Sequence, residues 1–404
     1  MISIDRALEV VRDAVALKAR PDRMPAEAVS LEFCLNRILR ENIVADSDYP
    51  RFDKAIRDGF AVRAEDVARV PTVLRILGES RAGLAASVSV VPGTCCEIMT
   101  GAPLPDGADA VVMVEYTEAA SESTVRILRA GREGDGLLRR AAELRTGESV
   151  LSPGRRIQLA DIGTLASIGK PQVLVSRKPR VAILATGDEL VEVAQSPEGG
   201  QIRNSNSYTL HAQVVAAGAE PVLLGIGRDT LEDLGAQIGR GLQFDVLLVS
   251  GGVSMGKYDF VENVFADFGV EVLFESVAMK PGKPTVFGHR NDTFVFGLPG
   301  NPVSTIVAFR MFVTPVLQGL LQAAPSGTPT LRARLEVAAK CDAARTAIVP
   351  ALVRFEGESY WIRTVPWKGS SDLAGLSRAN ALVVIPQAEG SLQAGDVVEF
   401  LSLE

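Results

Sequence analysis

Histidine is almost absent from this 404-residue chain, which contains only His211 and His289. Two imidazoles exclude a multi-histidine metal centre and leave little choice for a Ser-His-Asp triad. The four cysteines show no CxxC spacing, which excludes a zinc or redox site of that kind, and we expect all four to be buried as small apolar residues. Any catalysis must therefore use carboxylates, Lys, Arg, hydroxyls, backbone amides, or a hard metal bound by oxygen.

Two further features are missing: an excess of positive charge and a long apolar run. With 42 Lys and Arg against 49 Asp and Glu, the net charge is −7, which argues against a broad basic face for nucleic acid. No apolar run approaches the roughly 18 residues that span a bilayer, and the opening residues MISIDR lack the pattern of a signal peptide. We therefore expect a cytoplasmic protein with no nucleic-acid partner and no membrane partner.

The chain is long enough for about two to four domains. Ser3 is placed to cap a first helix, in which apolar residues recur at helical spacing from Ile4 onward. From about residue 27 to 180, short apolar runs alternate with turns, which predicts β-rich N-terminal lobes. A linker at 323–329 precedes a predicted small C-terminal β-domain.

The middle of the chain predicts an α/β domain. Continuous apolar runs occupy 180–185, 244–250 and 293–296, and helical patterns follow at 206–217, 258–268 and 302–321. Such strands alternating with helices indicate a parallel sheet with helices on both faces. Ligands bind these sheets beyond the carboxyl ends of the strands, where the intervening loops lie. The predicted fold class is therefore multidomain α/β and β, with the α/β domain in the centre.

Acidic residues follow two of the predicted strands. Asp188 and Glu189 come directly after the first apolar run, behind a glycine that permits a sharp turn, and Asp229 follows the strand-like segment 222–226. Taken alone, Asp188 and Glu189 are equally typical of a helix N-terminus that carries favourable acids. Asp229 taken alone most often indicates an ordinary turn. The next loop, residues 250–256 with the sequence SGGVSMG, allows backbone N–H groups to converge on an anion, although it matches neither GxGxxG nor a P-loop.

Two later turns carry the signature of anion binding. Lys280 and Lys283 are the only charges of a Lys-Pro-Gly-Lys-Pro turn, which suits a small and highly charged anion. In residues 297–304, Asn301 is a candidate helix cap and Pro302 takes the first helical position, so we expect the amides there to face an anion.

Further polar turns complete the predicted site. Asp259 lies just beyond the 250–256 loop, where it can hold a cation near the anion, and in the N-terminal half Asp58 and Thr100 each lie in a glycine turn. Together these residues predict an oxygen-lined site. Its carboxylates suit Mg²⁺, and its amides and lysines suit phosphates or an oxyanion.

The order of these motifs is that of a known family. DGFA, MTGAPLP, TGDEL, SGGVSMGKYD, KPGKP and GLPGNPVS make the chain resemble the molybdopterin molybdenumtransferases over nearly its whole length. The resemblance implies a homodimer of four-domain subunits, whose molybdopterin-binding α/β domain is shared with the adenylyltransferase that precedes it in the pathway. The implied reaction takes adenylylated molybdopterin and molybdate, releases AMP with Mg²⁺, and leaves molybdenum on the dithiolene. The implied domains are 1–26 with 46–59 and 144–177 (domain I, dimerisation), 27–45 with 60–143 (domain II), 178–324 (domain III) and 328–404 (domain IV).

The resemblance also implies roles for individual residues. The catalytic carboxylates are Asp58, Asp188, Glu189, Asp229 and Asp259; Glu189 and Asp259 bind Mg²⁺, and Asp58 is supplied by the partner subunit. The molybdate pocket contains Lys280 and Lys283, with Ser304 nearby. The pterin and its phosphates are bound by Ser250, Gly251, Gly252, Ser254, Pro299, Gly300, Asn301 and Pro302, and the cleft is closed by Thr100 and Gly101.

Three segments depart from the family pattern. Residues 54–57 are Lys-Ala-Ile-Arg, and residues 139–143 keep an acid but lose a glycine. Pro350 stands where the family has an arginine that would help to bind molybdate, and Arg345 and Arg354 are the candidates to replace it. Two other functions stay open, a non-catalytic scaffold that binds the pterin and a molybdopterin adenylyltransferase. Besides a second copy of the chain, the expected partners are the molybdopterin adenylyltransferase and maturation factors of molybdenum enzymes.

Overall fold

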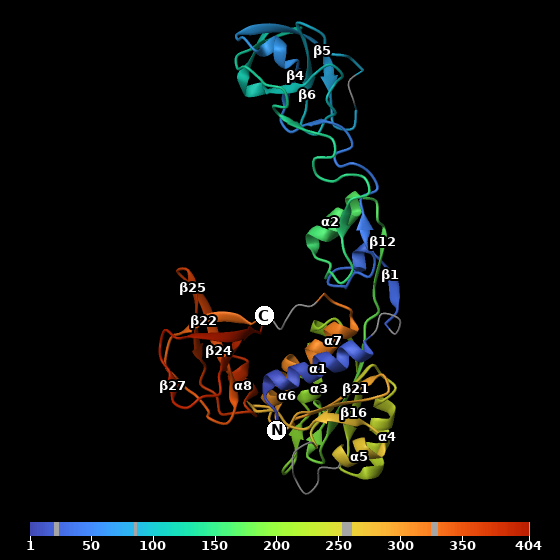
Figure 1. The fold of residues 1–404 in the computed structure, drawn as a ribbon, viewed down its shortest axis with the longest axis vertical. Helices are drawn as coiled ribbons and strands as arrows, with labels where there is room; N and C mark the ends of the chain where they lie inside the picture. Colours follow the sequence, from blue (N-terminus) through green and yellow to red (C-terminus); the bar gives the residue numbers. More distant parts are fainter. Residues whose placement is uncertain (20–23, 85–86, 253–260, 325–329, 404) are drawn as a thin grey trace. The chain divides into compact units, whose positions relative to one another are not determined.

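The protein is described by a computed structural model that covers residues 1–19, 24–84, 87–252, 261–324 and 330–403. It divides into two compact units. The larger unit comprises Met1–Arg40, Gly154–Gln158 and Val173–Glu404, and the smaller unit comprises Glu41–Pro153 and Leu159–Gln172 (Figure 1). The boundaries of the four expected domains stay a prediction.

A six-stranded sheet forms the centre of the larger unit. Its order is β16 (Glu220–Gly227), β13 (Arg180–Thr186), β17 (Val246–Ser250), β21 (Thr293–Leu298), β20 (Val286–Arg290) and β18 (Glu271–Phe274). The first four strands are parallel, which confirms the predicted α/β domain, and β20 runs antiparallel to both of its neighbours, β21 and β18. The antiparallel edge was not predicted, because a short apolar run does not reveal its direction.

The strands of this sheet are buried on both faces. Along β13, Val181 and Ile183 pack into one core cluster while Ala182 and Leu184 pack into another. The first cluster joins the sheet to α1 (Ile4–Lys18), α3 (Asn206–Ala216), α6 (Pro302–Ala308) and α7 (Thr314–Leu320), and the second joins it to α4 (Leu231–Gly241) and α5 (Val261–Asp267). Each fully buried aliphatic side chain contributes about 1.5–3 kcal/mol, so these two layers hold the sheet edge rigid beneath its loops. The predicted cap of α1 is confirmed, because Ser3 Oγ accepts from the Arg6 N–H at 3.2 Å.

One helical segment reaches the length of a membrane span, although we expected from the sequence that no apolar run would be that long. It runs through α6, a π-helical turn (η4, Phe309–Val313) and α7, and the window Pro302–Leu320 is apolar enough by composition. However, 67% of that window is buried inside the protein, and Val307, Phe312 and Val316 belong to the first core cluster. A segment buried to this extent is typical of a helix in the core of a folded domain.

The predicted C-terminal β-domain is also present. Its sheet contains β19 (Met279–Lys280), β24 (Thr346–Glu356), β25 (Ser359–Thr364), β22 (Leu331–Leu335), β28 (Val397–Ser402) and β26 (Ala381–Ile385). Beside it, β23 (Ala339–Lys340) pairs with β27 (Ser391–Leu392), and α8 (Leu373–Leu376) follows β25. Because β19 belongs to the loop between β18 and β20, the Lys-Pro-Gly-Lys-Pro turn is attached to this sheet.

The smaller unit is β-rich, as predicted. Its main sheet has the order β7 (Ala110–Met113), β4 (Gly59–Val62), β6 (Thr94–Ile98), β5 (Thr72–Ser80), β9 (Thr124–Ile127) and β8 (Thr117–Ser121). Two short ladders, β3 (Lys54–Ala55) with β10 (Leu137–Leu138) and β2 (Ile43–Val44) with β11 (Ser149–Leu151), accompany it together with α2 (Leu159–Ser167).

All four cysteines are free and buried, as expected. Cys95 and Cys96 lie next to each other in β6, where burial raises the pKa of Cys95 to about 12 and that of Cys96 to about 11. Both thiols therefore stay protonated near neutral pH and serve as small apolar side chains.

Candidate active site

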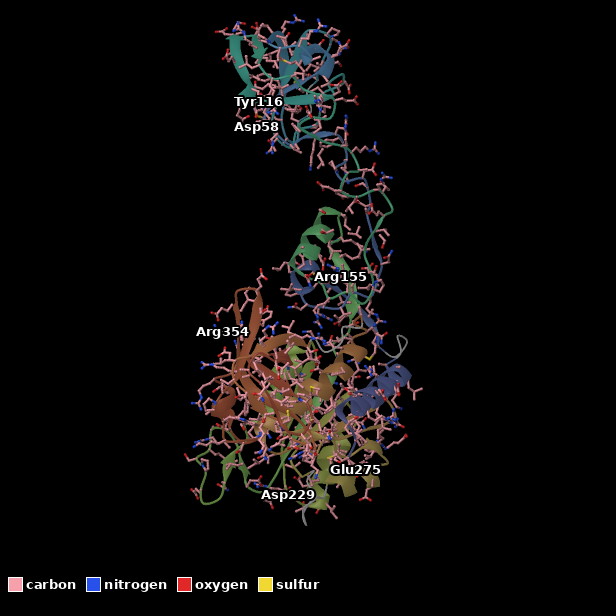
Figure 2. All side chains as sticks on the ribbon, turned by 60° about the vertical axis from the view of Figure 1, so that its left-hand side comes forward. Asp58, Tyr116, Arg155, Asp229, Glu275 and Arg354 are labelled. Atoms are coloured by element: carbon pink, nitrogen blue, oxygen red, sulfur yellow. The ribbon has the colours of Figure 1, made fainter. Side chains whose placement is uncertain are left out.

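The carboxyl ends of β13 and β16 bring three of the predicted acids to one edge of the sheet. Thr186 pairs with Gly227, so the residues that follow these strands are neighbours. The backbone N–H of Asp229 donates to Asp188 Oδ1 at 3.4 Å. Asp188 and Glu189 are both exposed, and Figure 2 marks Asp229. Two carboxylates thus face solvent at the edge where the family's substrate is expected.

A glycine is required at the turn before these acids. Gly187 has φ +145°, and a Cβ at this position would lie 2.5 Å from Glu189 Oε2. The backbone conformation therefore favours glycine here, and a side chain would also have to displace the Glu189 carboxylate.

The loops after β17 and β21 press against each other. Gly251 has φ +102°, its N–H donates to the Leu298 carbonyl at 3.0 Å, and a Cβ there would lie 2.5 Å from the Thr186 carbonyl oxygen. A Cβ on Gly300 would lie 3.7 Å from Gly251 Cα. The predicted pterin residues Gly251, Gly252, Pro299 and Gly300 thus belong to two adjacent loops, whereas Ser254 and Asp259 lie outside the described residues.

Asn206 holds these loops together, and sequence analysis did not assign it to the site. Its Nδ2 donates to Ser250 Oγ at 2.9 Å and to the Gly300 carbonyl at 2.7 Å. Its Oδ1 and the Oγ1 of Thr186 are buried, and within the described part of the chain neither has a hydrogen-bond partner. The only sequence signal was an asparagine at the start of a helical pattern, which is equally typical of a helix cap.

The Lys-Pro-Gly-Lys-Pro turn is built by its own backbone. Gly282 has φ +104°, and a Cβ there would lie 2.3 Å from Met279 Cε. The carbonyl of Lys283 accepts from two N–H groups, those of Val277 at 3.0 Å and Thr285 at 2.9 Å. Lys280 and Lys283 are exposed at either side of the glycine, so the turn presents both ammonium groups to solvent.

The helix start at 301–304 lies close to this turn. The Ser304 carbonyl oxygen would be 3.7 Å from a Cβ on Gly282, and Ser304 is buried. Asn301 and Pro302 occupy the N-cap and first-turn positions, as predicted, but the Asn301 side chain makes no capping hydrogen bond. The Val303 N–H donates to the carbonyl of Ser370 at 3.0 Å, so one of the amides expected to face an anion is already satisfied by the C-terminal domain.

In the smaller unit, two separately predicted residues meet. Thr100 donates to Asp58 Oδ1 through its backbone N–H at 2.6 Å and through its hydroxyl at 2.7 Å. These two bonds lower the pKa of the Asp58 carboxyl, so it is ionised near neutral pH. Gly101 has φ +82° and donates its N–H to Ala55, which fixes the turn that carries Thr100.

Comparison with known proteins decides the family. A molybdopterin molybdenumtransferase of Bacillus subtilis (strain 168) is 36% identical over 383 residues, covering 93% of this chain and 89% of the relative. One from Nostoc sp. (strain PCC 7120) is also 36% identical, over 387 residues. The chain belongs to the molybdopterin molybdenumtransferase family. It is therefore a transferase of molybdenum cofactor biosynthesis.

Each part of the chain matches its counterpart in this family. Residues 2–169 match the MoeA N-terminal region (domain I and II), residues 182–319 a probable molybdopterin binding domain, and residues 332–403 the MoeA C-terminal region (domain IV). Among solved structures, a molybdopterin biosynthesis MoeA protein from Pyrococcus horikoshii OT3 has a TM-score of 0.84 at 27% identity, covering 99% of both chains.

Pro350, at the position where the resemblance implied an arginine, lies inside a strand. Pro350 is buried in β24, where its carbonyl accepts the Val365 N–H at 3.0 Å. Of the two candidate replacements, Arg354 is paired with Glu336 at 2.9 Å. Arg345 approaches Asp342 at 3.4 Å, and Asp342 lines a cavity that Lys280 also lines. Arg345 is therefore the candidate closer to the predicted oxyanion site.

The segment 139–143 is held by ion pairs in the molybdenumtransferase chain. Arg139 pairs with Asp53 at 2.7 Å, and Arg140 pairs with Asp48 at 2.7 Å. The Thr146 backbone N–H, followed by the Arg140 side chain, lowers the pKa of Asp48 to about 2. Directly after Arg140 the chain bends through Ala141, a non-glycine residue at φ +61°.

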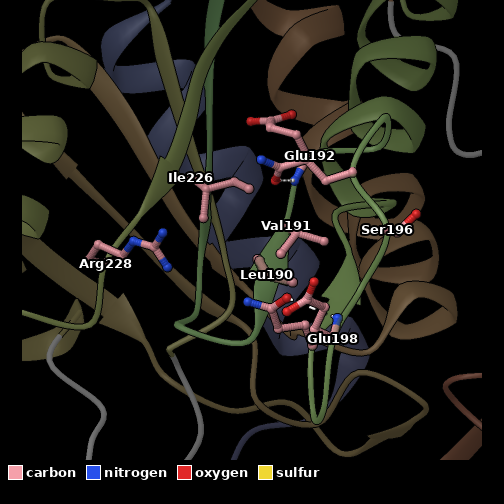
Figure 3. A pocket seen from close by; sticks show the side chains of 9 residues that line it. Leu190, Val191, Glu192, Ser196, Glu198, Ile226 and Arg228 are labelled. Carbon is pink, nitrogen blue, oxygen red and sulfur yellow. Dashed lines mark hydrogen bonds between the residues drawn. The ribbon is translucent and has the colours of Figure 1, made fainter.

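Two of the cavities in the larger unit lie near predicted site residues. The first, of about 690 Å³, lies beside the acidic edge and is lined by residues that include Leu190, Glu192, Ser196, Ile226 and Arg228 (Figure 3). The second, of about 790 Å³, adjoins the lysine turn. In the described ranges, no three His, Cys, Asp or Glu side chains are grouped so as to hold a metal ion by themselves.

Proposed function

We propose that this molybdenumtransferase inserts molybdate into adenylylated molybdopterin and releases AMP in a reaction that requires Mg²⁺. One observation carries the proposal: an exposed pair of acids and two glycine loops from parallel strands lie along one sheet edge. The lysine turn lies against the helix that starts from the same edge. This arrangement suits a substrate with a phosphate-rich end and an end that receives an oxyanion.

In this proposal, the glycine loops and the lysine turn bind different parts of the reactants. Glycine at 251 and 300 lets the two loops pack closely on the end of β13 and on each other, and we propose that the phosphates bind beside these loops. Lys280 and Lys283 attract the molybdate dianion by charge and orient it for transfer. Asn206 keeps the two loops in register, and Ser304 lies behind the lysine turn.

The donor set fits Mg²⁺ that is shared with substrate phosphates. Mg²⁺ typically takes one or two protein carboxylates and completes its shell with phosphate oxygens and water. Glu189 is exposed and forms no ion pair with any residue that the structure describes, whereas Asp188 lies 4.0 Å from the Arg228 guanidinium. When bound, Mg²⁺ would neutralise charge on the phosphate that leaves as AMP. We propose Glu189 as its principal protein ligand, supported by Asp188, Asp229 and Asp259.

The assembly and location are part of the same proposal. We propose a cytoplasmic homodimer in which Asp58 is supplied across the subunit interface, with Thr100 fixing its carboxylate. The proposed partners are the molybdopterin adenylyltransferase and maturation factors of molybdenum enzymes.

A second candidate is a scaffold that binds the pterin without turnover. The buried proline in place of the family arginine favours it, because one molybdate contact is lost. Tight pterin binding without AMP release would support this candidate, and ATP-dependent adenylylation of molybdopterin would instead identify an adenylyltransferase.

The deciding experiment measures AMP release from adenylylated molybdopterin, with and without molybdate and Mg²⁺. We expect release that depends on both, and at least about a hundredfold loss in Glu189→Gln. The matched control is Glu192→Gln, a neighbouring acid that lines the first cavity. Wild-type protein that releases no AMP would contradict the proposal, as would Glu189→Gln with wild-type activity.

A further inference from the structure

One cation, Arg228, lies at the acidic edge and has no role in the reaction as described so far. It follows β16 directly, and because Thr186 pairs with Gly227, its neighbour at the sheet edge is the turn that carries Asp188. The Arg228 guanidinium lies 4.0 Å from Asp188 Oδ1. Among the described residues that line the cavity of about 690 Å³ beside this edge, Arg228 is the only cation.

The backbone of Arg228 is anchored where α4 begins. Its N–H donates to Asp233 Oδ2 at 2.7 Å, and its carbonyl accepts the Thr230 N–H at 2.7 Å. The Thr230 hydroxyl in turn accepts the Asp233 N–H at 3.3 Å, so the turn and the helix cap stabilise each other. Figure 3 shows the Arg228 side chain extending from this anchored position toward the cavity.

The pairing with Asp188 does not account for this placement. Both side chains are exposed, by 60% for Arg228 and 68% for Asp188, and they approach only to 4.0 Å. An exposed ion pair of this kind contributes little to stability, because water solvates both charges and the long side chains lose freedom when they pair. The guanidinium can therefore turn from Asp188 to a bound anion at little cost.

A phosphate at this edge requires positive charge. Asp188, Glu189 and Asp229 follow neighbouring strands, and the Asp229 N–H lies 3.4 Å from Asp188 Oδ1. Three carboxylates close to one another repel a phosphate unless cations lie beside them. The lysine turn is assigned to the oxyanion, so Arg228 is the side chain placed to supply this charge. Its planar guanidinium can donate two parallel N–H bonds to two oxygens of one phosphate, which an ammonium group cannot do.

We propose that Arg228 binds the phosphate of the adenylyl group, both in the substrate and in the product AMP. This inference rests on the proposed function, which supplies the adenylylated substrate and places its phosphates near the acidic edge. The phosphate competes with Asp188 for the guanidinium. Mg²⁺ bound by the acids favours the same exchange, because it weakens the attraction of Asp188 for a second cation.

The first test measures binding rather than turnover. AMP and adenosine are titrated by calorimetry into the full chain in the presence of Mg²⁺. We expect Arg228→Gln to weaken the dissociation constant for AMP at least about tenfold, as the loss of hydrogen bonds between charged groups does, and to leave adenosine binding as in wild type. Arg228→Lys keeps the charge but loses the paired donors, so its affinity for AMP should lie between the other two.

Arg240→Gln is the matched control. Arg240 is an exposed arginine in the last turn of α4, at the opposite end of the helix that Arg228 precedes, and it donates to Gln237 Oε1 at 2.9 Å. This variant should bind AMP as wild type does. A second readout is AMP release from the adenylylated substrate, which should fall at least about tenfold in Arg228→Gln and stay unchanged in Arg240→Gln.

A loss of AMP affinity in Arg228→Gln, with adenosine binding and Arg240→Gln unaffected, supports the proposal. Wild type that binds AMP no more tightly than adenosine would overturn it, and so would equal losses for the two ligands. A change confined to the Mg²⁺ requirement would also overturn it, because the role of Arg228 would then be limited to Asp188. None of these results decides the proposed function, which depends on AMP release by wild type and its loss in Glu189→Gln.

Discussion

Single side chains fix loops in both units that carry predicted site residues. One amide group, Nδ2 of Asn206, connects the end of β17 with the loop after β21 by donating to Ser250 Oγ at 2.9 Å and to the Gly300 carbonyl at 2.7 Å. A second local anchor is Thr100, whose N–H and hydroxyl both donate to Asp58. Each anchor orders a loop that carries predicted substrate-binding residues.

Removing the Asn206 amide should loosen both loops. We expect Asn206→Ala to lower the free energy of unfolding by about 1–3 kcal/mol, because two acceptors lose their donor, and to reduce AMP release. Urea denaturation measures the first effect. Asn301→Ala is the control, since its side chain makes no capping bond, and its stability should change by less than about 0.5 kcal/mol. Equal stability losses in the two variants would contradict the anchoring role.

Ala141 is held in a conformation that suits glycine. At φ +61° its Cβ is strained, which costs roughly 1–2 kcal/mol, partly offset by the higher entropy of glycine in the unfolded chain. Ala141→Gly should therefore raise the free energy of unfolding by up to about 1 kcal/mol. Ala142→Gly, next to it but not at positive φ, should lower that free energy instead, and thermal unfolding of both variants provides the comparison.

Asp48 makes one contribution to stability that depends on pH. Its pKa is lowered from 3.8 to about 2 in the folded protein, so its contribution is complete above the unfolded value and is lost as the pH falls from 3.8 toward 2. Asp48→Asn should flatten the acid limb of the stability curve in that window. Urea titrations of wild type and variant across roughly pH 2 to 4 measure the slopes; identical slopes would show that Asp48 is not the group responsible.

At the scale of elements, the strand-to-loop junctions carry the strictest requirements. Gly251 has φ +102° and a Cβ there would approach the Thr186 carbonyl to 2.5 Å, whereas Gly269, at φ +66°, has open space around its Cβ position. The positive φ therefore disfavours any side chain at both positions. Only at Gly251, which lies at the proposed site, would an added Cβ also clash with a neighbouring backbone atom.

This difference gives a matched pair of variants. Gly251→Ala should displace the loop after β17 and abolish most AMP release, while Gly269→Ala should cost only about 1–2 kcal/mol of stability and keep the activity. Steady-state AMP release and urea denaturation separate the two effects. Normal activity in Gly251→Ala would show that the substrate does not approach this loop.

Sequence patterns predicted the elements that repeat a simple period and missed those set by tertiary contacts. The continuous apolar runs correctly indicated β13, β17 and β21, because a strand buried on both faces needs apolar residues at every position. The antiparallel pair β18 and β20 was missed, since pairing direction depends on where the chain returns. Helix 302–320 was not foreseen as a span-length segment, because Pro, Ser, Thr and Arg interrupt its apolar residues.

In the candidate site, too, local motifs could be predicted from the sequence, whereas contacts between distant side chains could not. The glycine and lysine motifs located the loops, whereas the clamp by Asn206 and the contact of Thr100 with Asp58 depend on side chains brought together by folding. The cavity beside the lysine turn combines residues far apart in the chain, and no local spacing could have indicated it.

At the scale of the whole molecule, one α/β domain supplies the acidic edge and a C-terminal domain closes over its lysine turn. The chain as a whole belongs to the molybdopterin molybdenumtransferase family. We propose that its acidic edge and its lysine turn act on one substrate. The most direct measurement is AMP release from adenylylated molybdopterin by wild type, Glu189→Gln and Lys280→Ala, with molybdate varied. We expect release that falls at least about a hundredfold in Glu189→Gln at every molybdate concentration, and a raised molybdate requirement in Lys280→Ala. Release that is independent of molybdate, or unchanged in both variants, would contradict it.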